Sequence, residues 1–201
     1  MLLLIQLFFM LKTNRTSTYP INPIILNRWS PRAMTGKPIR DTVLMSFFEA
    51  ARWAPSGMNN QLTRFVYAKK GTLHWQKFMD LLNESNQKWC ADAAVLVIVI
   101  SRKISYHKDR PQKSHSFEAG ATYQNFALEA TSRGFVAHAM GGFDKEKAHA
   151  MLGLHENWNV EVMIAVGEYD REKSKEKEET ASGRKPLAEL VFEGVLPEDF
   201  E

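Results

Sequence analysis

An unbroken apolar run at residues 93–100, which reads AAVLVIVI, constrains the fold more than any other feature of this chain. The run is short and rich in β-branched side chains, so it suits a strand better than a helix. A strand that is apolar at every position has to be covered on both faces, as in the middle of a sheet with helices above and below. Residues 160–166 predict a second strand of similar character.

Shorter patterns predict the elements around these strands. Apolar residues recur at helical spacing after Asp41, a candidate N-cap, until Pro55 and Gly57 end the pattern. Further helices are expected after Gly71, from Ser116 to Ser132 and from Asp144 to Leu152, and further strands at 65–68 and 135–140. Interspersed helices and strands indicate an α+β or an α/β fold.

Three stretches lie outside this regular pattern. Residues 13–39 carry four prolines and predict an extended lead-in segment. The charged run at 171–179 is expected to be a solvated loop. Residues 186–192 alternate enough to predict a final strand, which would need the edge of a sheet on this chain or on a partner.

The first eleven residues are almost wholly apolar, with Gln6 the only polar side chain among them. As a helix they would cover about half of the hydrocarbon core of a bilayer, so no transmembrane span is expected. Three interpretations stay open: an arm that packs on a partner subunit, an interfacial anchor, or extra sequence upstream of a start at Met10. No function is assigned to these residues.

Composition and charge exclude several classes of protein. The chain has 201 residues, of which 44% are hydrophobic, enough for one folded domain and too many for a disordered chain. Its single cysteine, Cys90, cannot pair within the chain and favours a cytoplasmic setting. A net charge of +3, with no basic stripe interleaved with aromatic residues, argues against a nucleic-acid partner.

The motifs of several common reaction types are missing from the sequence. No G-x-G-x-x-G loop, G-x-x-x-x-G-K-[ST] loop, G-x-S-x-G elbow or H-E-x-x-H pair occurs. The six histidines show no short paired spacing, so no metal site is expected. The chemistry of this chain therefore has to come from polar clusters at loop positions.

One such cluster is Arg28, Ser30 and Arg32 in the lead-in segment. In an extended chain alternate side chains project to one side, so these three could converge on one anion. Guanidinium groups bind phosphate oxygens as a two-pronged fork. A solvated basic loop is the alternative for this cluster taken alone.

Two further clusters are rich in amides and glycines. Residues 55–61 (PSGMNNQ) carry side chains that both donate and accept hydrogen bonds, as the edge of a planar heterocycle requires. Residues 140–144 (MGGFD) offer backbone N–H groups that no side chain shields, directly before a helix. Taken alone, each could be an ordinary turn or connection. Arg184 and Lys185 complete the basic set near the predicted final strand.

In chain order, these clusters resemble those of the FMN-dependent nitroreductase family. The resemblance runs from Asn27 to Phe192 and comprises R-x-S-x-R at 28–32, A-P-S-x-x-N-x-Q at 54–61, N-Q-x-W at 86–89, M-G-G-F-D at 140–144 and the late basic pair. Each motif alone is weak, but five in order are specific. The chain departs from common family patterns at Leu62 and Thr63, where many members have Pro-Trp, and at Gly141, where some have Glu.

The resemblance implies an α+β fold with a mixed central β-sheet flanked by helices. It also implies an intertwined homodimer in which the C-terminal strand of each chain adds to the sheet of its partner. The chain would divide into an N-terminal arm, residues 1–26, and a single FMN-binding domain, residues 27–201. Two FMN molecules would lie in the dimer interface, each touched by both chains.

The same resemblance implies a set of cofactor-binding residues and no catalytic side chain, because the cofactor carries the chemistry. Arg28, Ser30 and Arg32 would bind the phosphate and the pyrimidine edge of the ring, and the late basic pair would bind phosphate. Asn86 could reach the polar edge of the ring, and the glycine pair would present N–H groups near flavin N5. The 55–61 loop would come from the other subunit. The expected residues are Arg28, Ser30, Arg32, Pro55, Ser56, Gly57, Asn59, Gln61, Asn86, Met140, Gly141, Gly142, Arg184 and Lys185.

The activity implied is transfer of a hydride from NADH or NADPH, through flavin N5, to a nitroaromatic, quinone or similar small-molecule acceptor. Both substrates would use one site in turn, which is a ping-pong mechanism. Two other interpretations stay open: a flavin-binding module without turnover, and a relative such as a reductive dehalogenase. The sequence distinguishes neither the acceptor nor NADH from NADPH. Among the histidines, His138 lies closest to the glycine pair along the chain.

Overall fold

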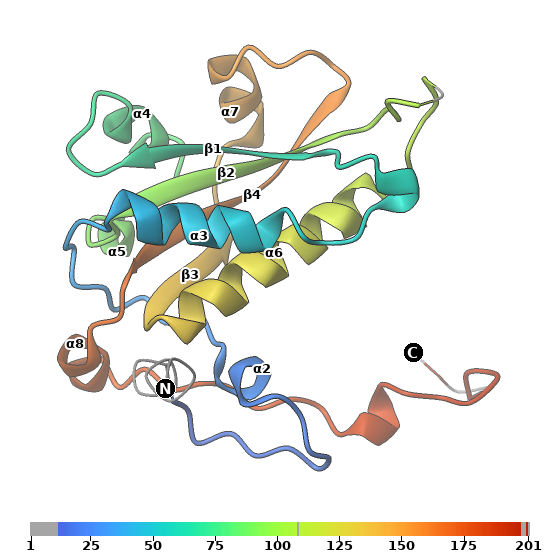
Figure 1. Cartoon of the computed structure of the whole chain (residues 1–201). Helices are drawn as coiled ribbons and strands as arrows, with labels where there is room; N and C mark the ends of the chain where they lie inside the picture. Colours follow the sequence, from blue (N-terminus) through green and yellow to red (C-terminus); the bar gives the residue numbers. More distant parts are fainter. Residues whose placement is uncertain (1–11, 108, 198–199, 201) are drawn as a thin grey trace.

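A four-stranded antiparallel sheet forms the centre of the computed structural model, which describes residues 12–107, 109–197 and 200 (Figure 1). The strand order is β1-β2-β4-β3. The bounds are Thr63–Lys69 for β1, Val95–Arg102 for β2, Phe135–Met140 for β3 and Trp158–Glu168 for β4. The prediction for the apolar residues 1–11 falls outside the described residues.

Helices cover both faces of this sheet. Figure 1 shows α3 and α6 across one face and α4, α5 and α7 on the other. Their bounds, with those of the remaining helices and 3-10 turns, are α2 Pro23–Asn27, α3 Asp41–Ala51, η1 Gly57–Asn59, α4 Trp75–Met79, α5 Glu84–Cys90, α6 His115–Ser132, α7 Lys145–Met151, α8 Arg171–Glu176 and η2 Leu187–Glu189. The predicted α+β class is confirmed.

The apolar run at residues 93–100 supplies most of the central strand β2, which begins two residues later than expected, at Val95, and ends at Arg102. Val95, Val97 and Val99 face the cluster built with α3 and α6, whereas Leu96 and Ile98 belong to the cluster on the other face. All five are at most 1% exposed. Burying such side chains stabilises the fold by roughly 1.5–3 kcal/mol each, which explains why both faces are apolar from Val95 to Ile100; the polar residues Ser101 and Arg102 come only at the end of the strand.

The helix starts differ in how they are capped. The predicted cap Asp41 is instead the first residue of α3, whose N-cap, Arg40, makes no capping bond with its side chain. Asp144 caps α7 as predicted, because its carboxylate accepts from the backbone N–H of Lys147 at 2.8 Å. The N-cap of α6 is Ser114, and the predicted cap, Ser116, lies inside the helix. The hydroxyl of Ser116 instead donates to Glu161 of β4 at 2.8 Å, so it ties the helix to the sheet.

Two expectations about the second half of the chain are wrong for a single chain. Residues 171–176 form the helix α8 and not a solvated loop, because Asp170 caps it by accepting from the N–H of Lys173 at 3.0 Å. Residues 186–192 form no strand; they contain the exposed 3-10 turn η2. All pairings among the described strands are antiparallel, so a mixed sheet would need a strand from another chain.

Candidate functional site

Four arginines surround one cavity of about 390 Å³, which we call the arginine cavity. It includes four of the expected residues, Arg28, Ser30, Arg32 and Arg184. The expected residue Lys185 does not line it, and its ammonium lies 3.7 Å from Glu189. The full lining is Arg15, Arg28, Trp29, Ser30, Pro31, Arg32, Glu179, Thr180, Ser182 and Arg184.

The two walls of the arginine cavity come from distant parts of the chain. One wall is the extended segment 28–32 that follows α2, where the guanidinium of Arg28 donates to the hydroxyl of Ser30 at 3.1 Å. The other wall is the segment 179–184 after α8. The carboxylate of Glu179 joins them, because it accepts from the N–H groups of Arg32 at 2.8 Å and Ala33 at 3.2 Å.

The electrostatics of this cavity favour an anion. Four guanidinium groups face one carboxylate, and that carboxylate is already bonded to two backbone N–H groups. Burial and repulsion from Arg184 and Arg28 lower the pKa of Arg15. The indole nitrogen of Trp29 is a buried donor with no hydrogen-bond partner in the described part of the chain. A phosphate group would supply the negative charge that these guanidinium groups lack.

The glycine pair lies at the end of β3, against two asparagines. A Cβ atom at Gly142 would lie 2.4 Å from Nδ2 of Asn83 and 2.8 Å from Nδ2 of Asn86, whereas a Cβ at Gly141 would meet open space. Neither glycine N–H donates to a backbone or side-chain acceptor of the described residues. Both glycines line a second cavity, of about 490 Å³, which we call the glycine cavity.

Asn86 acts on the glycine pair in this structure. Its Nδ2 donates to the carbonyl of Gly142 at 3.0 Å, and its Oδ1 accepts from the indole of Trp89 at 3.1 Å. The backbone N–H of Asn83 donates to the same carbonyl at 3.1 Å. The two bonds to the carbonyl of Gly142 fix its peptide plane, and the bond from Trp89 holds the side chain of Asn86 in place. Met140 is only 4% exposed and packs in the core, with its sulfur 3.5 Å from Cys90 Sγ.

Trp89 connects the arginine cavity with the glycine pair. Its ring lies 4.7 Å from the ring of His138 and 5.8 Å from the guanidinium of Arg32. Burial and the charge of Arg32 lower the pKa of His138, although hydrogen bonding to Pro31 opposes this. Nδ1 of His138 lies 3.1 Å from the carbonyl of Pro31, which can only accept, so Nδ1 carries the proton. Through this contact His138 supports the segment that carries Arg32.

The 55–61 loop lines a third cavity, of about 370 Å³, which is mainly apolar and which we call the β1 cavity. Pro55, Ser56 and Gln61 line it together with residues of α3 and β1. Met58, Asn59 and Gln61 all have positive φ values, between 49° and 55°. Such backbone is unfavourable for residues other than glycine and concentrates at functional sites.

Two residues that the sequence reasoning missed hold this loop. Asn60 is buried; its Oδ1 accepts from Ser105 at 2.9 Å and from the N–H of Tyr106 at 3.0 Å. Glu118 of α6 accepts from the N–H of Gly57 at 3.0 Å, and its other carboxylate oxygen, Oε2, is buried with no partner among the described residues. The expected residue Asn59 is exposed. In the sequence, the adjacent Asn59 and Asn60 indicate that an amide matters in this loop, but they do not show which of the two is buried.

One chain does not bring all the expected residues together. The three cavities share no lining residue: Arg28 lines the first, Gly142 the second and Ser56 the third, while Asn59 lines none of them. In Figure 1 the short helix η1, drawn in cyan, lies at the far side of the molecule from α2. A shared site would therefore need a loop from a second chain.

Two features are absent from the described ranges, 12–107 and 109–197 with residue 200. Within them, no helix has the length and apolar character needed to cross a membrane. Nor does any group of three or more His, Cys, Asp or Glu side chains there have a metal-binding arrangement.

Comparison with known proteins identifies the family. The model of the Nitroreductase family matches residues 25–85 and 69–168. A solved oxidoreductase containing FMN is 40% identical, with a TM-score of 0.86 over 92% of this chain and 98% of that one. A Desulfovibrio desulfuricans protein, provisionally described as a nitroreductase and solved in complex with FMN, is 26% identical, with a TM-score of 0.71 over 89% of this chain and 100% of that one.

Curated relatives agree with this assignment. A Ralstonia nicotianae protein that carries the provisional name NADH dehydrogenase/NAD(P)H nitroreductase is 24% identical over 76% of this chain and 90% of its own length. Protein DrgA of Synechocystis is 24% identical over 71% of this chain and 80% of its own length. The family match spans well over half of the sequence, so this chain belongs to the nitroreductase family.

Proposed function

We propose that this chain is an FMN-dependent oxidoreductase that moves a hydride from NADH or NADPH, through flavin N5, to a nitroaromatic, quinone or similar acceptor by a ping-pong mechanism. The observation that carries the proposal is the arginine cavity, in which four guanidinium groups face one already bonded carboxylate. Two structural neighbours are described as containing FMN, and a curated relative is named for NAD(P)H. A cytoplasmic setting stays part of this proposal; Cys90 is a free, buried thiol.

The residues present fit the phosphate end of FMN. Arg28, Arg32 and Arg184 would bind the phosphate oxygens as charged forks, and the hydroxyl of Ser30 would add a neutral donor. Lys185 would contribute only by moving away from Glu189.

FMN, when bound, accepts a hydride at its ring and passes the electrons on to an acceptor. The chain's own part is to position the ring and to stabilise charge. The free N–H groups of Gly141 and Gly142 would donate hydrogen bonds near N5. Arg28 or Arg32 would stabilise the negative charge that develops at the N1/O2 edge. No described side chain needs to act as an acid or base in this scheme.

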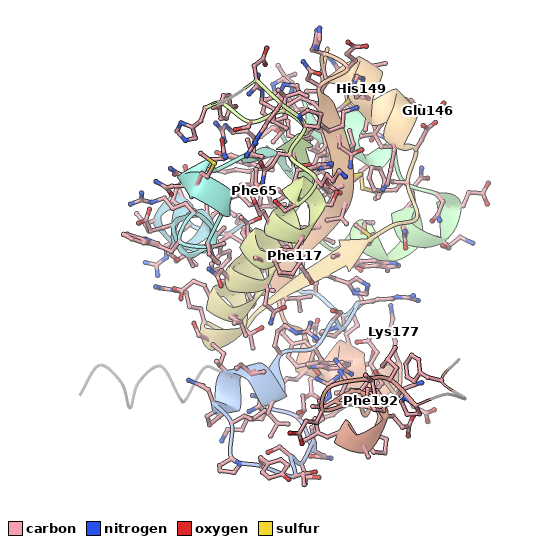
Figure 2. All side chains as sticks on the ribbon, turned by 90° about the vertical axis from the view of Figure 1, so that its right-hand side faces the viewer. Phe65, Phe117, Glu146, His149, Lys177 and Phe192 are labelled. Carbon is pink, nitrogen blue, oxygen red and sulfur yellow. The ribbon has the colours of Figure 1, made fainter. Side chains whose placement is uncertain are left out.

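We also propose a homodimer in which the C-terminal segment adds to the partner's sheet. Within the described residues β1 pairs only with β2, so its outer edge is free beside the apolar β1 cavity. The C-terminal segment exposes Leu190 at 56% and Val191 at 67%. Figure 2 shows Phe192 in the lower part of the molecule, well away from Phe65 of β1, so the segment cannot serve this edge in its own chain as it stands. The partner's 55–61 loop would then complete each site.

The test is anaerobic mixing of the purified, FMN-loaded protein with NADH or NADPH. We expect the absorbance of the oxidised flavin to bleach with at least one of them and to return when a nitroaromatic or quinone is added. Binding of FMN without bleaching would instead indicate a flavin-binding module without turnover.

The arginine cavity is tested separately with Arg28→Ala. We expect this variant to lose FMN during gel filtration, because a charged fork to the phosphate is removed. Arg40→Ala is the matched control, since Arg40 is an exposed arginine outside the three cavities. Equal flavin content in both variants and the parent protein would contradict the assignment.

A further inference from the structure

We infer that Arg15 is a positioning residue for the FMN phosphate: its guanidinium fastens the two walls of the arginine cavity together and so sets the affinity for a phosphate between them. This inference rests on the proposed function. Arg15 lies in the lead-in segment, upstream of the R-x-S-x-R cluster, and no sequence motif points to it.

The guanidinium of Arg15 bridges the two walls of the arginine cavity like a clamp, with one hydrogen bond to each wall. Nη1 of Arg15 donates to the carbonyl of Arg28 at 2.8 Å, on one wall of the cavity. Nε of the same guanidinium donates to the carbonyl of Ser182 at 2.8 Å, on the other wall. The second acceptor lies 167 residues further along the chain. The planar guanidinium, with five N–H donors in a fixed arrangement, is well suited to hold two carbonyls on separate segments in this way.

The charge of Arg15 is not needed for these bonds, and its position makes that charge unfavourable. It stands among Arg28 and Arg184, whose repulsion, together with burial, lowers its pKa. None of these three arginines forms an ion pair with a carboxylate of the described residues. An anion in the cavity would remove this repulsion for all of them at once.

Anchoring of the lead-in segment does not explain the clamp. The N–H of Thr13 already donates to Oδ1 of Asn27 at 2.8 Å, which fastens this segment to α2. The contact of Arg15 with Ser182 adds a link to the C-terminal wall, which that anchor does not make. What Arg15 adds is therefore a fixed separation between the walls that carry Arg28 and Arg184.

The experiment compares FMN with riboflavin, which has the same ring and ribityl chain but no phosphate. The dissociation constant of each is measured by flavin fluorescence on the cofactor-free full chain, for the parent protein, Arg15→Ala, Arg15→Lys and the control Arg40→Ala. In Arg15→Ala we expect FMN to bind about tenfold more weakly, while riboflavin changes less than about twofold. Arg15→Lys should restore part of the FMN affinity, because an ammonium can still donate to a wall carbonyl but lacks the planar fork that reaches both.

Each other outcome has a definite meaning. An equal loss of FMN and riboflavin binding in Arg15→Ala would overturn the inference, because it would make Arg15 a folding residue only. A parent protein that binds FMN no more tightly than riboflavin would contradict the proposed phosphate site itself. If Arg15→Ala fails to fold by circular dichroism, the FMN-to-riboflavin ratio of Arg15→Lys decides: an unchanged ratio overturns the inference.

Discussion

Position 142 has no room for a side chain, because the amide groups of Asn83 and Asn86 lie against it. A Cβ atom there would lie 2.4 Å from Nδ2 of Asn83, which is closer than real Cβ contacts allow. We therefore expect Gly142→Ala to lower the free energy of unfolding by about 1–3 kcal/mol, since the asparagines that bond to its carbonyl have to move. Urea denaturation of the FMN-free protein measures this change.

The neighbouring glycine is the control for that substitution. Gly141 has open space where a Cβ would be added, so Gly141→Ala should change the unfolding free energy by less than about 0.5 kcal/mol. If both variants unfold at the same urea concentration, Asn83 and Asn86 would have room to move, and the tight support of the glycine pair would be disproved.

Single residues were the hardest level to predict from the sequence. Asn59 and Asn60 are neighbours with the same chemistry, and the one the sequence reasoning favoured, Asn59, is exposed. Asn60 is buried because residues 105 and 106, about 45 positions away, supply its partners. Arg15 was missed for the same reason, since Ser182 lies 167 residues from it. No local pattern carries such information.

At the scale of elements, the start of α6 is attached to β4 through Glu161. Burial raises the pKa of this carboxyl, but hydrogen bonds from Ser101, Asn159 and Ser116 outweigh burial and bring the pKa below its ordinary value of 4.5. A carboxyl with a lowered pKa in the folded state stabilises the protein above pH 4.5, and this stabilisation is lost as the pH falls through the lowered pKa.

Glu161→Gln tests this attachment. At pH 7 we expect the variant to be about 1–3 kcal/mol less stable, because hydrogen bonds to a charged acceptor are lost. Below pH 4.5 its stability should fall less steeply than that of the parent, so the two urea midpoints converge. The exposed Glu146 provides the control variant, Glu146→Gln. A parallel pair of stability–pH curves for Glu161→Gln and the parent would refute this account.

Elements with a strong apolar pattern were predicted well. The strand expected at 135–140 has these bounds in the structure, and the run at 93–100 is the buried centre of the sheet. The side chains of these strands pack against helices on both faces of the sheet, so burial requires apolar residues there. An apolar run in the sequence therefore predicts such a strand. The helix α8 was not predicted, because the many charges at 171–179 indicated a solvated loop and the N-cap residue Asp170 was not considered.

At the scale of the whole molecule, the expected final strand is the main test of the homodimer. A strand needs a partner edge, and residues 186–192 have none within one chain as described. The sequence also indicated the separate clusters of the proposed site but not how they come together. In a single chain they line three separate cavities. In the proposed homodimer, contact between two copies of the chain would both pair residues 186–192 and bring the clusters together.

Leu190→Asp is the substitution that tests this contact. Leu190 is 56% exposed in the single chain and would be buried against the partner. A buried, unpaired carboxylate is strongly unfavourable, so we expect the mass in solution to fall from dimer toward monomer at micromolar concentration, together with loss of bound FMN. Analytical ultracentrifugation gives the mass.

The matched control for the dimer is Leu73→Asp. Leu73 is 93% exposed and lies outside the three cavities and the C-terminal segment, so its replacement should leave the mass unchanged. A parent chain that sediments as a monomer, or a Leu190→Asp variant that keeps the parent's mass and flavin, would contradict the homodimer with exchanged C-terminal segments.

The two walls of the arginine cavity also impose an order on biosynthesis. Arg32 and Glu179, which bond across it, are separated by 147 positions. At translation rates of about 5–20 residues per second, the ribosome needs roughly 7–30 s to reach the second wall after it has made the first. Throughout that interval the nascent chain has only one of the two walls, so an anion can be bound between them only after residues 179–184 have been made.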